Sequence, residues 1–134
     1  MTVALLRGGR YLLRVQSFGG GGSGAYNIQS LRNSVKVLVL DKREQGSIGA
    51  ESSDIWSFQG RAGQTVIISA RSADFDVSIS LRGPDGVEVG SDDDGGDGTN
   101  SLLSRRLPLN GAYTVWVNAK QGRGSYVLRL MEAP

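Results

Sequence analysis

The densest group of chemically capable side chains is an acidic, glycine-rich loop at residues 92–98, which carries Asp92, Asp93, Asp94 and Asp97. Calcium takes about six to eight oxygen ligands, and carboxylates on a loop bent by glycine can supply several of them. Carboxylates this close together also repel one another unless a cation lies between them. The loop therefore predicts a calcium site. The alternative is a solvated turn closed by aspartate side chains.

The spacing in this loop matches neither of two familiar calcium motifs. Gly96 stands where an EF-hand would place its third ligand. The stretch from Gly95 to Leu102 is close to a calcium-binding nonapeptide repeat, but it occurs once and has Asn100 at the aspartate position. Any calcium site here would therefore have its own arrangement of ligands.

Other chemistry is excluded by composition, because the chain of 134 residues has no cysteine and no histidine. Thiol nucleophiles, Ser–His triads and zinc sites built on these residues cannot form. Paired carboxylates for glycoside hydrolysis normally face each other across a cleft, and a flexible acidic loop does not provide that arrangement. We therefore predict that the protein is not an enzyme.

The net charge of +2 conceals an uneven distribution. Residues 1–45 carry +5 and the remainder carries −3, so a basic leading segment precedes an acidic body. The arginines are scattered without an aromatic platform, which argues against nucleic-acid binding. The longest apolar runs, such as Val37–Leu40, are too short to cross a bilayer, and Met1–Leu6 lacks the pattern of a signal peptide.

The elements that must position the acidic loop are predicted to be strands. Short runs of β-branched and aromatic residues alternate with Gly, Asn, Asp and Ser, and no stretch has helical periodicity. In residues 112–118, Tyr113, Val115 and Val117 point to one face, and Trp116 points to the other. The predicted strands cover 10–16, 25–31, 35–40, 54–58, 64–70, 75–82, 87–89, 102–107, 112–118 and 125–130.

An internal repeat links the two ends of the chain. The pattern G-x-Y-x-x-x-V, a glycine-rich turn and G-x-Y-x-[IL] occurs in residues 9–28 and again in residues 111–128. Each copy predicts a β-hairpin with an apolar face. The chain should thus begin with the last hairpin of one unit, spanning Gly9–Leu31, and continue through a complete second unit. The side chains of the first copy that should be built for burial are Tyr11, Leu13, Val15, Tyr26 and Ile28.

From Gly46 to Leu130 the sequence resembles the bacterial pre-peptidase C-terminal domain family. The resemblance is carried, in this order, by Asp54-Ile55-Trp56-Ser57-Phe58, Ala62-Gly63-Gln64-Thr65-Val66, Asp76-Val77-Ser78-Ile79-Ser80-Leu81, Gly83-Pro84-Asp85-Gly86, the acidic loop and the final tyrosine hairpin. It implies an exported, non-catalytic module attached to secreted proteins. Some relatives bind calcium and some bind polymers such as collagen. The resemblance also makes Glu44, Glu51 and Asp54 weaker metal candidates, because calcium-binding relatives place ligands near the first strand of the unit.

These observations predict an all-β protein: an antiparallel, jelly-roll-like β-sandwich at residues 46–134, preceded by a hairpin segment and linker at residues 1–45. Trp116 lies out of phase with the buried face, so we expect it either to be an exposed binding surface or to be covered by a neighbouring unit. The predicted function is a non-catalytic module of a secreted or cell-surface bacterial protein that serves binding, targeting or structural spacing, with a protein or an extracellular polymer as its partner. The alternative is a fibre subunit that exchanges its N-terminal β-segment head-to-tail.

Overall fold

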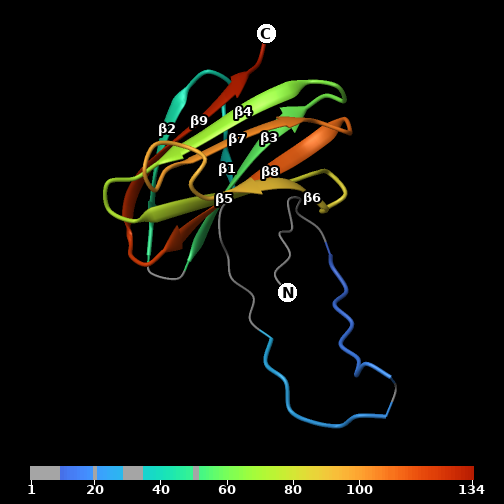
Figure 1. The fold of residues 1–134 in the computed structure, drawn as a ribbon. Helices are drawn as coiled ribbons and strands as arrows, with labels where there is room; N and C mark the ends of the chain where they lie inside the picture. The colour runs from blue at the N-terminus through green and yellow to red at the C-terminus, as the bar shows by residue number, and fades with distance from the viewer. Residues whose placement is uncertain (1–9, 20, 29–34, 50–51) are drawn as a thin grey trace. The chain divides into compact units, whose positions relative to one another are not determined.

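The computed structural model describes residues 10–19, 21–28, 35–49 and 52–134 (Figure 1). Its contacts divide the chain into two units, Met1–Arg32 and Asn33–Pro134. The second unit is a β-sandwich. In the part of the chain that the structure describes, no helix is long and apolar enough to cross a membrane.

Nine strands form the two sheets of the sandwich in the described residues. The five-stranded sheet has the order β1-β3-β8-β5-β6 and the four-stranded sheet the order β2-β9-β4-β7. Their bounds are β1 Lys36–Val37, β2 Arg43–Ile48, β3 Ser53–Gly60, β4 Thr65–Arg71, β5 Asp76–Arg82, β6 Glu88–Asp92, β7 Ser101–Arg106, β8 Gly111–Lys120 and β9 Gly124–Glu132. From β3 onward the chain passes between the sheets at nearly every connection, and β5–β6 stays within one sheet. The predicted jelly-roll-like sandwich is confirmed.

The core between the sheets follows from the alternation of side chains along each strand. On β5, Val77, Ile79 and Leu81 are at most 1% exposed, and the residues between them are partly exposed. Ile68 on β4 and Leu128 on β9 face them from the other sheet and are fully buried. Each fully buried aliphatic side chain of this kind is worth about 1.5–3 kcal/mol relative to an exposed one.

A buried polar network joins the two sheets around Tyr126. The tyrosine lies on β9 and is 2% exposed. Its hydroxyl donates to Asp54 Oδ2 at 2.6 Å and accepts a hydrogen bond from Trp56 Nε1 at 2.7 Å, both on β3. Lys36 of β1 completes the network through an ion pair with Asp54 Oδ2 at 2.7 Å. Burial, which disfavours the phenolate, raises the pKa of Tyr126 well above its ordinary value, so the hydroxyl stays protonated.

The predicted N-terminal hairpin differs from the structure. Residues 10–19 and 21–28 contain no strand, and a turn occurs at residues 18–19. The remainder of the predicted hairpin, residues 9, 20 and 29–31, lies outside the described residues. A two-stranded hairpin with nothing packed on its apolar face is marginal in water, so the repeat pattern alone does not produce paired strands.

The predicted boundary at Gly46 is also displaced. The compact second unit begins at Asn33, because the segment after it contributes strands to both sheets. β1 pairs in parallel with β3, and β2 pairs antiparallel with β9. The sequence of β2, REQGSI, has no apolar alternation, so no pattern in these residues predicts this strand.

Candidate functional site

An acidic cluster lies at one end of the five-stranded sheet. Asp76 takes the first outward position of β5, because Val77 after it points into the core. The loop that follows β6 supplies Asp93 and Asp94. One carboxylate oxygen from each of these three aspartates lies within 4.8 Å of the others. Carboxylate oxygens gathered in this way are the ligands that calcium prefers.

The cluster already contains one cation, Lys120. β8 pairs antiparallel with β5 so that Lys120 lies opposite Asp76, and its ammonium forms an ion pair with Asp93 Oδ2. The hydrogen bond to Asp93 raises the pKa of Lys120, and the charges of Asp76 and Asp94 act in the same direction. One lysine against three carboxylates leaves the cluster with a net charge of −2 when all four groups are ionised.

Two oxygens of the cluster are inaccessible to water and have no hydrogen-bond partner in the described residues. They are Asp76 Oδ1 and Asp93 Oδ1. A carboxylate oxygen withdrawn from water without a compensating partner is unfavourable. A bound cation would satisfy both atoms and offset the remaining negative charge.

The loop that carries Asp93 and Asp94 is held in place by its neighbours. Asp92 Oδ2 accepts hydrogen bonds from the backbone N–H groups of Gly95 at 2.9 Å and Leu102 at 2.8 Å. Ser101 is buried, and its Oγ lies 2.6 Å from the carbonyl oxygens of both Val77 and Asp93. Asp92 therefore shapes the loop and does not contribute to the carboxylate cluster.

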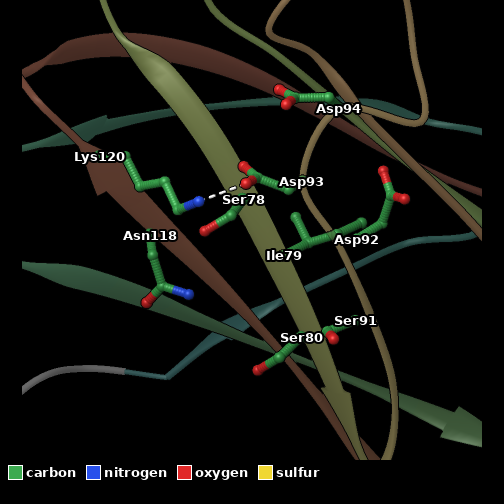
Figure 2. A pocket seen from close by; sticks show the side chains of 9 residues that line it. All are labelled: Ser78, Ile79, Ser80, Ser91, Asp92, Asp93, Asp94, Asn118 and Lys120. Atoms are coloured by element: carbon green, nitrogen blue, oxygen red, sulfur yellow. Dashed lines mark hydrogen bonds and ion pairs between the residues drawn. The ribbon is translucent and has the colours of Figure 1, made fainter.

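Around the cluster the outer face of the sheet forms an open depression of about 460 Å³. Figure 2 shows Lys120 and Asp93 directed toward each other beside Ser78, whereas Asp92 points away from them. The lining of this depression combines hydroxyl, amide, ammonium and carboxylate groups with one aliphatic residue. The lining residues are Ser78, Ile79, Ser80, Ser91, Asp92, Asp93, Asp94, Asn118 and Lys120. Such a surface suits a hydrated cation better than an apolar ligand.

The structure therefore brings together only part of the predicted metal site. Asp93 and Asp94 meet, but the side chain of Asp97 is 93% exposed and lies 3.6 Å from Arg71. Asp97 instead contributes its backbone oxygen to the loop, where it accepts from Asn100. The sequence prediction missed Asp76 and Lys120. The strand alternation places Asp76 outward, but the sequence does not reveal that Asp76 and Lys120 pair across strands.

The weaker metal candidates do not join this cluster. Glu44 forms an ion pair with Lys42 at 3.1 Å, and Asp54 is occupied by Lys36 and Tyr126. Glu51 lies outside the described residues.

Residues 52–119 match the family model of the bacterial pre-peptidase C-terminal domain. The match covers about half of the chain and includes all three clustered aspartates. The chain belongs to this family. Pre-peptidase C-terminal domains are non-catalytic modules. A search of curated protein sequences finds no match.

Solved structures share the fold of this pre-peptidase C-terminal domain at low sequence identity. The pre-peptidase C-terminal domain of a Bacillus anthracis collagenase has a TM-score of 0.64 at 17% identity, covering 76% of this chain and 99% of its own. The g-type lysozyme inhibitor PliG of Salmonella Typhimurium has a TM-score of 0.55 at 23% identity, covering 75% of this chain and 100% of its own. PliG of Aeromonas hydrophila has a TM-score of 0.54 at 15% identity, covering 73% and 98%.

Trp116 is not an exposed platform in this pre-peptidase C-terminal domain. Although it points away from the core as predicted, it is 6% exposed. The guanidinium of Arg82 lies over its ring, 4.4 Å from the centroid, and its Nε1 donates to Thr114 Oγ1 at 3.2 Å. A cation over the indole face is favourable in itself, so the ring is covered from within its own sheet. The exposed binding surface predicted there is wrong.

Proposed function

We propose that this chain is an exported, non-catalytic accessory module whose fold is stabilised by calcium bound at Asp76, Asp93 and Asp94. The observation that carries the proposal is the pair of buried, unpartnered oxygens on Asp76 and Asp93 beside the carboxylate of Asp94. Calcium accepts irregular coordination and keeps waters, which fits a cluster at the rim of an open depression. In this role the metal is structural.

The family and the neighbouring folds support a proposal for the location and the partner. Two neighbours are named as periplasmic inhibitors of g-type lysozyme, which supports export and shows that a sandwich of this fold can serve a protein that acts on another protein. For this chain we propose a secreted or cell-surface location. We propose that its partner is a protein or an extracellular polymer, and that it has no hydrolytic activity of its own.

Calcium is expected to raise the melting temperature of the full chain. A ligand that binds only the folded state at a concentration of about 100 times its Kd stabilises that state by about 2.7 kcal/mol. For a domain of this size that corresponds to a rise of roughly 10 °C. The measurement is thermal unfolding followed by circular dichroism in EDTA and in increasing calcium, with Asp93→Asn/Asp94→Asn expected to abolish the rise.

Asp97→Asn is the matched control, because it removes one negative charge from the same loop at a side chain that lies outside the cluster. It should keep the full response to calcium. In EDTA, Asp94→Asn should melt no lower than the native protein, because it relieves repulsion within the cluster. An unchanged melting curve of the native protein in millimolar calcium would exclude the calcium proposal.

Head-to-tail self-association is the second candidate function. It is favoured by the large apolar side chains of the first unit that are exposed to solvent. The five residues predicted for assembly have these exposed fractions: Tyr11 53%, Leu13 64%, Val15 46%, Tyr26 67% and Ile28 54%. Burying them in a second copy would remove this apolar surface from water.

Deleting residues 1–31 is expected to abolish association while leaving the sandwich folded, because the strands of the second unit all follow this segment. Sedimentation velocity over a range of protein concentrations measures the assembly, and circular dichroism checks the fold. If the full-length and shortened proteins are both monomers at every concentration, self-association is not the function of this segment.

A further inference from the structure

We propose that the outer edge of β1 in one copy of the chain is the acceptor for residues 10–16 of a second copy, which add to it as a strand. The proposal rests on the second candidate function, self-association, and identifies the surface that would receive the N-terminal segment. It is independent of the calcium site at the acidic cluster.

The acceptor is the segment at residues 36–41, which closes one side of the sandwich. Lys36 and Val37 pair with β3, and the N–H of Leu38 donates to Ser57 O at 2.8 Å. The segment then reaches the other sheet, where Leu40 bridges to Leu130. The inner edge of this segment is thus hydrogen-bonded to both sheets. The outer edge of β1 has no strand partner within the described residues.

Between Lys36 and Asp41, which are charged, the outward side chains of this segment are apolar. Leu38 points inward and is 3% exposed, but Val37 is 72%, Val39 46% and Leu40 41% exposed. Lys36 is the only charged residue of the β1 strand, and its charge is compensated by Asp54 and lies 5.2 Å from the Trp56 ring centroid. Charged side chains usually protect an edge strand against pairing with another chain. This edge lacks that protection, because its exposed side chains are β-branched and the charge of its lysine is already paired.

The other three edge strands of the sandwich do have that protection. Charged side chains on an edge oppose strand addition, because a partner would have to bury or match them. An exposed charged side chain occurs on each of these strands: Arg43 on β2, Glu88 on β6, and Arg105 and Arg106 on β7. The edge of β1 is therefore the one that the described sandwich leaves suited to a new strand.

Residues 10–16 fit this edge by pattern. Leu13 and Val15 are exposed and lie on either side of Arg14, and the segment is not part of any strand. If the segment pairs with β1, these side chains become cross-strand neighbours of Val37 and Val39, which have the same two-residue spacing. The backbone supplies affinity and the matched apolar pairs set the register, as in other strand additions. Because donor and acceptor are different surfaces, the contact is head-to-tail.

Two variants of the full chain separate the donor from the acceptor. Val37→Lys/Val39→Lys places charges on the acceptor edge, and Leu13→Ser/Val15→Ser removes the apolar face of the donor. Each variant alone is expected to be monomeric, with self-association at least tenfold weaker than in the native protein. Mixed together, they should form a 1:1 heterodimer that grows no further, because each still has the surface that the other has lost.

Matched controls are Val87→Lys, which charges an exposed valine elsewhere, and Leu12→Ser, which removes an exposed leucine of opposite phase. Both should associate like the native protein in sedimentation velocity, with circular dichroism confirming the fold of every variant. If the donor variant is monomeric but Val37→Lys/Val39→Lys still associates, another edge is the acceptor, and this inference fails while self-association stands. A native protein that is monomeric throughout would overturn both.

Discussion

Replacing Gly46 with alanine is expected to destabilise the sandwich by about 3 kcal/mol, at the upper end of typical overpacking. Gly46 lies opposite Tyr126 in the β2–β9 pair. An added methyl group would come within 2.3 Å of the Cζ and hydroxyl oxygen of that tyrosine. The ring cannot swing aside without breaking its bonds to Trp56 and Asp54. Urea unfolding followed by tryptophan fluorescence would show the loss as a lower midpoint at unchanged slope.

Gly49→Ala is the matched control, because a methyl group there would meet nothing closer than 3.6 Å. It should change the free energy of unfolding by less than about 0.5 kcal/mol. A double-mutant cycle locates the cause. In a Tyr126→Leu background the ring is gone, so Gly46→Ala should cost much less than in the native protein. An equal cost in both backgrounds would show that the clash is not with Tyr126.

Replacing Tyr126 with phenylalanine is expected to cost about 2–3 kcal/mol, more than the loss of an ordinary hydrogen bond. The change keeps the ring but removes the acceptor of the Trp56 indole N–H, which then remains buried without a partner. It also removes one donor to Asp54, leaving that carboxylate to Lys36. The free energy of unfolding from urea titration measures the effect.

The control for this prediction is Tyr26→Phe, because Tyr26 is 67% exposed. It should leave the midpoint of unfolding unchanged within error. A Tyr126→Phe protein as stable as the native one would mean that water replaces the hydroxyl beside Trp56, and that the hydrogen bonds of Tyr126 between the sheets do not contribute to the free energy of unfolding.

Sequence patterns predict β4, β5 and β9, because each buries one face and leaves the other at least partly exposed, and a period of two is visible in a single stretch of sequence. β8 is predicted from its alternating Tyr113, Val115 and Val117, although Thr114 and Trp116 on its other face are buried as well. β2 is not predicted, because its sequence has no alternation of apolar and polar residues. It has one fully buried side chain, Ile48, and its place is set by backbone pairing with β9 and by the tyrosine ring that covers Gly46.

The acidic cluster, too, can be predicted from the sequence only in part. The excess of carboxylates at residues 92–97 is a property of composition, and it is visible in the sequence without any knowledge of the fold. One further fact depends on strand register between segments far apart in the chain: Asp76 and Lys120 face each other across β5 and β8. Another depends on how the loop itself folds, because hydrogen bonds to Asp92 Oδ2 and to the backbone oxygen of Asp97 shape the loop and leave the Asp97 side chain outside the cluster.

The sequence by itself determined that this protein is an all-β member of its family, without Cys or His chemistry and with predictable inward-facing residues. Only the tertiary structure decided that Trp116 is covered by Arg82, that the described residues 10–19 and 21–28 contain no strand, and that β1 leaves an apolar edge. The physical reason is the range of the interactions involved. Side-chain alternation is local, whereas register, coverage and edge exposure depend on which distant strands become neighbours when the sheets close.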